Sequence, residues 1–242
     1  MTNVAAVIIP FRDRGTDPLR ARNLDCVLDH WADAHGHTAF VVSDGRKGKE
    51  LFNRHAAYNR GIRMALDELA DYDAFIFAES DMLVPADQIT EALRMACEHI
   101  GMVVPFSTYC YHSAQASERI RAGADPYVIK PMWKMDDCRS IGAINVLSRR
   151  TMDALGQWDE KFEGNWYDDD AMRLALEVLT GHTRFVPGSA HHLYHLPGHR
   201  GKHLTDKERD ATRRNQTRLG MYEHAAEVNN ASAIRRLLAG GS

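Results

Sequence analysis

Short apolar runs and helical patterns alternate along the first 105 residues of the chain. Apolar residues between the runs recur at the three- and four-residue spacing of amphipathic helices. This alternation predicts an α/β fold, in which helices flank a mostly parallel sheet and ligands bind beyond the carboxyl ends of the strands. The runs typical of buried strands lie at residues 4–9, 38–42, 74–78 and 102–104.

Three helices are predicted between and after these strands. The first opens at Pro18, where proline suits the first turn of a helix. The third spans residues 86–99. The residues expected to face the core are Leu24, Val27, Leu28 and Trp31 in the first helix, Ile62, Ala65, Leu66 and Leu69 in the second, and Ile89, Leu93 and Ala96 in the third.

The second half of the chain is less regular. Residues 106–139 show no clear period, and a loop of this length inside a compact domain is usually functional or mobile. Short elements follow: a strand at 144–147, a helix at 149–155, an amphipathic helix after Asp168, and one or two strands within 183–195. The tail from Thr205 is predicted to be helical, and its mixed charges favour a solvated helix over a polyanion site.

The charge balance and the cysteines of the chain limit the classes of function that we expect. Lys and Arg number 30 and Asp and Glu 33, a net charge of −3, so a nucleic-acid binder held by bulk charge is not expected. No apolar run approaches the roughly 20 residues that span a membrane, and no signal peptide is visible. The four scattered cysteines (Cys26, Cys97, Cys110 and Cys138) are typical of reduced thiols, so we expect a cytoplasmic protein.

Two polar motifs follow predicted strands. Glu79-Ser80-Asp81 places two carboxylates at a strand exit, where they can bind a hard divalent cation. Such triplets also occur in ordinary turns, but the apolar runs on both sides of this one favour a metal site. Arg12 and Arg14 follow the first strand, and Arg54 lies in a later loop. Guanidinium groups bind phosphate, although a solvated loop explains these arginines equally well.

Two motifs in the second half also carry chemistry. Trp166-Tyr167 precede three consecutive acids, which complement the dipole at a helix start. Aromatic faces also hold sugar rings, and a neighbouring carboxylate can take a proton from an acceptor hydroxyl. A histidine cluster follows, for which metal or phosphate contact and a plain surface cluster are both open. Its members are His191, His192, His195, His199 and His203.

The order of these motifs resembles the β-1,4-galactosyltransferase family, which has the nucleotide-diphospho-sugar transferase (GT-A) fold. The resemblance covers roughly residues 4–200. It implies a Rossmann-like GT-A domain over residues 1–242, with a nucleotide-binding half at 1–105, an irregular acceptor and metal half at 106–204, and a helical tail at 205–242. The matching segments are VIIPFRDR at 7–14, FNR at 52–54, FIFAESDMLVP at 75–85, IGAINVLS at 141–148, WYDDD at 166–170 and HLYH at 192–195.

The resemblance also implies roles for individual residues. Asp81, His195 and His192 would bind Mn²⁺ (or Mg²⁺), and Asp169 or Asp168 would be the general base. Arg12, Arg14 and Arg54 would hold the diphosphate of a nucleotide sugar, with uridine diphosphate (UDP) as the expected nucleotide. The wider set of expected donor contacts is Pro10, Phe11, Arg12, Arg14, Asp44, Arg54, Glu79, Ser80 and Trp166.

Three departures from the family pattern limit which properties of the family are expected of this chain. Glu79 stands where the family has Asp, His192 where it often has Met, and Trp166-Tyr167 where it has Gly-Gly. The donor sugar and the acceptor of that family are therefore not expected to be those of this chain. The expected activity is a metal-dependent, inverting transfer of a sugar to an acceptor hydroxyl.

Two functions from other classes are alternatives to sugar transfer. A sugar nucleotidyltransferase usually opens with a glycine-rich loop, whereas residues 11–15 hold one glycine. A non-catalytic nucleotide- or glycan-binding module is disfavoured by the intact acids at 79, 81, 168 and 169.

Overall fold

The computed structural model describes residues 4–35, 37–136, 141–164, 166–198 and 201–241. A six-stranded sheet forms its centre, in the order β2-β1-β3-β8-β5-β9. β1 pairs in parallel with β2 and β3, β9 pairs in parallel with β5, and β8 is antiparallel to both β3 and β5. The predicted mostly parallel α/β sheet is therefore confirmed. The strands are β1 (Ala5–Pro10), β2 (Thr38–Val42), β3 (Ala74–Ala78), β5 (Val103–Val104), β8 (Ile144–Ser148) and β9 (Arg184–Phe185).

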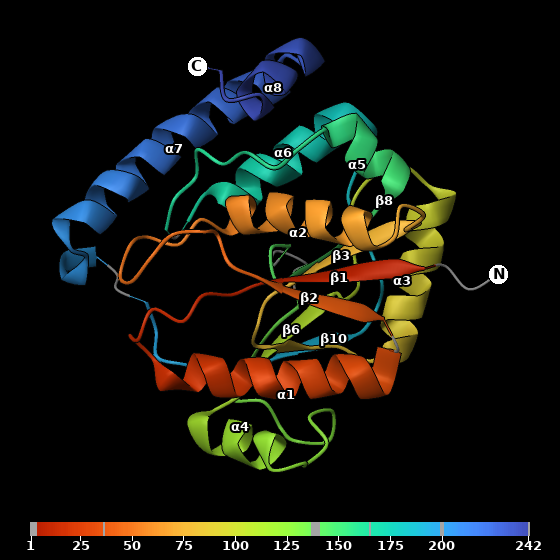
Figure 1. The fold of residues 1–242 in the computed structure, drawn as a ribbon, viewed down its shortest axis with the longest axis vertical. Helices are drawn as coiled ribbons and strands as arrows, with labels where there is room; N and C mark the ends of the chain where they lie inside the picture. Colours follow the sequence, from red (N-terminus) through yellow and green to blue (C-terminus); the bar gives the residue numbers. More distant parts are fainter. Residues whose placement is uncertain (1–3, 36, 137–140, 165, 199–200, 242) are drawn as a thin grey trace.

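Helices cover both faces of this sheet. Figure 1 shows α1 on one side and α2 and α6 on the other. The Asn53 side chain caps the start of α2 by accepting a hydrogen bond from the amide of Ala56. The prediction for Leu69 was wrong, because α2 ends one residue earlier and Leu69 is 41% exposed. The helices are α1 (Pro18–His35), α2 (Arg54–Glu68), α3 (Ala86–Glu98), α5 (Arg149–Leu155) and α6 (Asp168–Thr180).

Residues 106–139 contain regular structure that the sequence pattern did not reveal. A second sheet has the order β4-β10-β6-β7, and α4 (Ala114–Arg121) follows β6. These strands have two to four residues each, too few to show a period of two, and they are stabilised by partners far away in the sequence. Their bounds are β4 (Met82–Leu83), β6 (Thr108–Tyr111), β7 (Trp133–Met135) and β10 (Ser189–His192).

The C-terminal helices pack on the body of the protein. After a short 3-10 turn (Gly201–His203), α7 (Asp206–Glu227) lies along α6, and α8 (Ala231–Leu238) packs against both, as Figure 1 shows. The helical tail was predicted correctly, but a solvated helix was wrong because one face of α7 is buried. Asp159, which is 1% exposed, accepts hydrogen bonds from Arg218 and from the Tyr222 hydroxyl of this helix.

Two global expectations can be compared with the structure. No helix within the described part of the chain is long and apolar enough to span a bilayer. Cys26, Cys97 and Cys110 are free thiols, as predicted, and Cys138 lies outside the described residues.

Candidate functional site

Pairing of two short strands brings together one carboxylate and two imidazoles. Asp81 immediately precedes β4, and antiparallel pairing of β4 with β10 sets His192 opposite Met82. Oδ2 of Asp81 lies 3.3 Å from Nε2 of His195 and 3.8 Å from Nε2 of His192. One possible ligand atom from each of the three residues lies within 4.8 Å of the others. The structure therefore brings together the three residues that the resemblance assigned to a metal ion.

The donor set of this trio fits a divalent cation. Oδ1 of Asp81 is buried and has no hydrogen-bond partner among the described residues. A buried carboxylate oxygen without a partner is costly unless a cation or water satisfies it. Nδ1 of His195 lies 2.8 Å from the carbonyl of Leu196. When Nδ1 carries the ring proton and donates it to this carbonyl, the lone pair of Nε2 is free and faces Asp81. The trio therefore offers mixed oxygen and nitrogen ligands for such an ion.

The rest of the predicted histidine cluster does not join this trio. His191 points to the other face of β10, where its Nδ1 lies 2.9 Å from Nε2 of His112. Successive residues of a strand face opposite sides, which separates His191 from His192. His203 is exposed in the 3-10 turn, and His199 lies outside the described residues.

Arg54 lies among three carboxylates, one from the loop after β3 and two from the start of α6. Its guanidinium bonds to Glu79 at 2.9 Å, to Asp168 at 3.0 and 2.5 Å, and to Asp169 at 2.5 Å. The Arg54 side chain is 15% exposed. The structure therefore places Arg54 among the acids, with its donors engaged, rather than free for the diphosphate contact that the resemblance implied.

The pKa values of Asp168 and Asp169 are shifted in opposite directions. Burial and the charge of Asp168 raise the pKa of Asp169 to about 6, against the opposing effect of Arg54. Burial also acts to raise the pKa of Asp168, but the charges of Arg54 and His55 outweigh it and the pKa lies below its ordinary value. The side chain of Asp169 is 41% exposed and that of Asp168 only 8%. Of these two acids, Asp169 is thus the one that is both accessible and suited to exchange a proton near neutrality.

A glycine makes room for this carboxylate. A Cβ built on Gly142 would lie 2.2 Å from Cγ of Asp169. Gly142 follows the buried Ile141 and leads into β8, whose pairing with β3 holds the segment against the sheet. No residue with a side chain fits here unless Asp169 moves. The sequence offered Gly142 only as part of a family-like segment, without a stated role.

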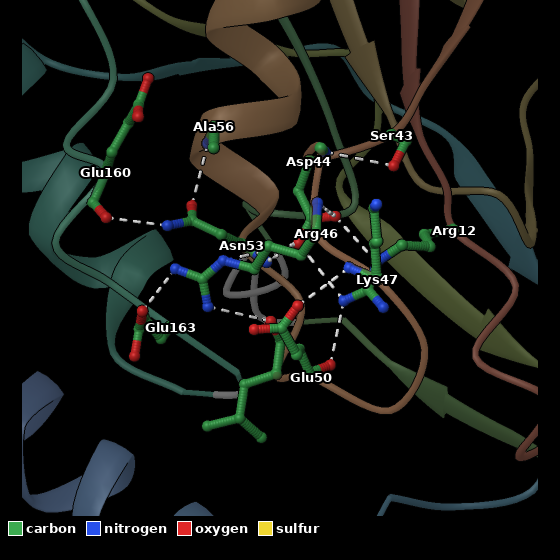
Figure 2. Close-up of polar contacts among 12 residues, drawn as sticks. Arg12, Ser43, Asp44, Arg46, Lys47, Glu50, Asn53, Ala56, Glu160 and Glu163 are labelled. Atoms are coloured by element: carbon green, nitrogen blue, oxygen red, sulfur yellow. Dashed lines mark hydrogen bonds and ion pairs between the residues drawn. The ribbon is translucent and has the colours of Figure 1, made fainter.

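The β2–α2 loop is held by a network around Asp44, shown in Figure 2. Arg12 donates to Oδ1 of Asp44 at 2.8 Å and to the carbonyl of Glu50 at 2.9 Å. The other Asp44 oxygen accepts from the amide of Asn53 at 2.9 Å. Asp44 is 7% exposed, and Arg46 extends the network to Glu163. Arg12 and Asp44 therefore shape this loop, and their donors and acceptors are engaged within the protein.

Two adjoining hollows collect most of the predicted site residues. A small cavity of about 130 Å³ adjoins a wider cleft of about 400 Å³. Asp44 and His192 line neither hollow. The predicted residues that line the small cavity are Pro10, Phe11, Arg12, Arg14, Ser80 and Trp166. Those that line the wider cleft are Pro10, Arg54, Glu79, Ser80, Asp81, Trp166, Asp168, Asp169 and His195.

Arg20 is a charged residue of both hollows that the sequence analysis missed. It projects from α1 and lines both hollows. Its guanidinium nitrogens lie 3.2 Å from Nδ1 of His195 and 4.0 Å from Oδ2 of Asp81. An arginine on the polar face of an amphipathic helix carries no local signal that separates it from a solvated one, so only the fold identifies it.

Comparisons with known proteins find likeness in structure alone. No family model and no curated protein matches the chain. It is similar to Drosophila β-1,4-galactosyltransferase 7, solved with manganese, UDP-Gal and xylobiose, at 17% identity and a TM-score of 0.46. That match covers 76% of this chain, which spans only 64% of the other.

Two further solved structures are similar over most of this chain. One is glucosyl-3-phosphoglycerate synthase from Mycobacterium tuberculosis, with Mn²⁺, UDP-glucose and phosphoglyceric acid, at 12% identity and a TM-score of 0.44 over 96% of this chain and 80% of the other. The other is a glycosyltransferase involved in glycosylation of the major capsid of PBCV-1, at 11% identity and a TM-score of 0.44 over 90% of this chain and all of the other. One of these similar structures, the galactosyltransferase, comes from the family whose motifs this chain resembles.

Proposed function

We propose that this chain is a metal-dependent, inverting glycosyltransferase that moves a sugar from a nucleotide diphosphate sugar, with UDP as the nucleotide, to an acceptor hydroxyl. One observation carries the proposal. A single cleft is lined by two residues that could bind a cation, Asp81 and His195, and by an accessible carboxylate, Asp169, whose pKa is raised to about 6. Sugar transfer needs both functions, one for the leaving diphosphate and one for the attacking hydroxyl.

Three candidate metal ligands and two arginines have parts in donor binding under this proposal. Asp81, His192 and His195 would hold Mn²⁺ or Mg²⁺, which when bound neutralises charge on the diphosphate. Arg20 lies beside this trio and Arg14 in the adjoining cavity, so both can bind phosphate oxygens. Arg14 is favoured over Arg12 for this contact because Arg12 is engaged with Asp44.

Asp169 is the proposed general base. It accepts the proton of the acceptor hydroxyl as that oxygen attacks the anomeric carbon, and the bond from that carbon to the diphosphate oxygen breaks. Arg54 and Gly142 hold the carboxylate in place. Attack and departure on opposite sides of the carbon invert its configuration. Base catalysis of this kind contributes about 10²–10⁴ in rate.

The test is a donor assay on the purified protein. Incubation with UDP-glucose, UDP-galactose, UDP-xylose and UDP-N-acetylglucosamine plus Mn²⁺ should release UDP and sugar slowly, even without an acceptor. NMR of the first product formed should show the anomeric configuration opposite to that of the donor. Release of pyrophosphate from UTP and a sugar 1-phosphate would instead support a nucleotidyltransferase, and binding without turnover of any donor would support a binding module.

A further inference from the structure

One nitrogen of His195 has two neighbours to which it cannot be hydrogen-bonded at the same time. Nδ1 lies 2.8 Å from the carbonyl oxygen of Leu196 and 3.2 Å from a guanidinium nitrogen of Arg20. A carbonyl oxygen only accepts, so a bond to Leu196 requires a proton on Nδ1. A guanidinium only donates, so a bond from Arg20 requires a lone pair on Nδ1. The two contacts therefore belong to different tautomers of the neutral imidazole.

The two tautomers differ in what they present to Asp81. Nε2 of His195 lies 3.3 Å from Oδ2 of Asp81. With the proton on Nδ1, Nε2 has a free lone pair and can bind a cation together with Asp81. With the proton on Nε2, that N–H faces the carboxylate and the nitrogen cannot bind a cation. A hydrogen bond from Arg20 to Nδ1 therefore favours the tautomer that is not a metal ligand, and the guanidinium, 4.0 Å from the same carboxylate oxygen, places a positive charge beside it.

Arg20 is held loosely enough to move. Its side chain is 43% exposed, and Asp81, at 4.0 Å, is the one carboxylate within ion-pair distance among the described residues. Arg12, by contrast, is bonded to Asp44 at 2.8 Å. Arg20 lines both hollows, and under the proposed function the diphosphate lies beside the metal ligands. Phosphate oxygens bind a guanidinium more strongly than a neutral imidazole does, so a diphosphate can take Arg20 away from His195.

The backbone on both sides of His195 is fastened to α1 and to the residue before it. The amide of Leu196 donates to Oδ2 of Asp17 at 2.7 Å, and Nδ2 of Asn23 donates to the carbonyl of Tyr194 at 3.2 Å. Asp17 is 6% exposed and Asn23 is fully buried. These bonds fix the position of the imidazole and of the Leu196 carbonyl. The guanidinium and the ring proton are therefore the parts that can change.

We propose that Arg20 couples binding of the metal ion to binding of the nucleotide. Its guanidinium keeps the proton of His195 on Nε2 until a diphosphate draws it away. The ring then gives the Nε2 proton to water and takes one from water on Nδ1, so its charge is unchanged. Nδ1 donates to Leu196, and Nε2 joins Asp81 as a ligand. This inference rests on the proposed function, and it makes a divalent ion a weak ligand of the protein alone and a tight one together with UDP.

The tautomer can be read directly in the wild-type protein. ¹⁵N NMR of histidine-labelled protein distinguishes protonated from unprotonated ring nitrogens, and comparison with His195→Gln assigns the signals. At about pH 8, where an ordinary histidine is neutral, we expect the proton on Nε2 in the protein alone. With UDP and Mg²⁺, which is diamagnetic, we expect it on Nδ1. A proton on Nδ1 in the protein alone overturns the proposal.

Arg20→Met removes the donors and keeps an unbranched side chain. In this variant alone we expect the proton on Nδ1 and an affinity for Mn²⁺ that is about 5-fold or more higher than in the wild type, measured by calorimetry. The factor by which UDP strengthens Mn²⁺ binding should fall by about 5-fold or more. Coupling between two ligands is reciprocal, so the same loss should appear in the factor by which Mn²⁺ strengthens UDP binding.

Arg22→Met is the matched control. It removes a positive charge from the same helix, where Arg22 bonds to Glu118 at 2.8 and 2.7 Å, and it should leave both affinities within twofold of wild type. An Arg20→Met protein that binds Mn²⁺ no more tightly than wild type, or no more tightly than Arg22→Met, overturns the coupling. UDP-dependent Mn²⁺ binding and donor hydrolysis by the wild type would still support the proposed function. A wild-type protein that binds neither Mn²⁺ nor UDP overturns both.

Discussion

Adding one methyl group at position 142 should displace the proposed base. The Cβ of Gly142→Ala would lie 2.2 Å from Oδ2 and 2.3 Å from Oδ1 of Asp169. Non-bonded carbon contacts are normally about 3.5–4.0 Å, so the carboxylate must move by about 1 Å or more. That movement breaks its 2.5 Å hydrogen bond to Arg54.

The effect on rate should be large and the effect on folding small. A displacement of about 1 Å in a catalytic group can cost about 10²-fold, and loss of the base costs up to about 10⁴-fold. We therefore expect kcat of Gly142→Ala to fall by about 10²–10⁴. Asp169 is 41% exposed and can turn toward solvent, so the protein should remain folded. Affinity for UDP with Mn²⁺ should stay within threefold, because Gly142 lines neither hollow.

Gly220→Ala is the control for this substitution. A Cβ at Gly220 would meet nothing within 4 Å, and the residue lies inside α7. Alanine there should be neutral for activity and should stabilise the helix by about 1 kcal/mol. Steady-state donor hydrolysis, circular dichroism and UDP calorimetry on both variants complete the test. A folded Gly142→Ala protein with kcat within threefold of wild type would refute the positioning of Asp169 as the base.

Three further predictions follow from the described contacts. Asp169→Asn should lower kcat by about 10²–10⁴; the wild-type rate should fall as pH drops below about 6, where Asp169 becomes protonated, and that acid limb should be absent from the variant. His195→Ala should weaken Mn²⁺ binding when UDP is present, and equal affinities by titration would remove His195 from the site. Arg218→Ala should lower the free energy of unfolding by about 3–5 kcal/mol in urea, because the buried carboxylate of Asp159 loses its charged partner and keeps only neutral donors, and a loss below about 1 kcal/mol would contradict this.

Most of the first half of the fold could be predicted, because its three long helices and the strands β1, β2 and β3 are long enough to show their own pattern. All six residues of β1 are buried, as a continuous apolar run predicts. The second sheet could not be predicted in the same way. β4 has two residues, and β7 pairs with a strand more than twenty residues earlier in the chain. Strands this short form because distant segments supply their partners, and a local pattern cannot show that.

The proximity of Asp81, His192 and His195 could be expected from the family resemblance, whereas the contacts of the arginines could not. The pairing of β4 with β10 accounts for this proximity, because it fixes the relative positions of the three residues. Arg12 and Arg54 were expected to bind diphosphate, but each lies against carboxylates of this chain. An arginine in a loop has the same sequence signal whether it binds a ligand or an internal acid. The distinction depends on which carboxylates the fold places within reach.

The packing of α7 against the small cavity has a consequence for dynamics. Glu208, Ala211 and Thr212 of this helix form part of the cavity wall, and Asn215 bonds to the backbone at Trp166. Local opening of α7 and occupancy of the cavity are therefore linked equilibria, since a ligand that needs the wall stabilises the closed helix. Saturating UDP should slow hydrogen exchange at the buried amides of α7. Loosening α8 through Leu237→Ala should in turn weaken UDP binding from a distance, because α8 packs against α7.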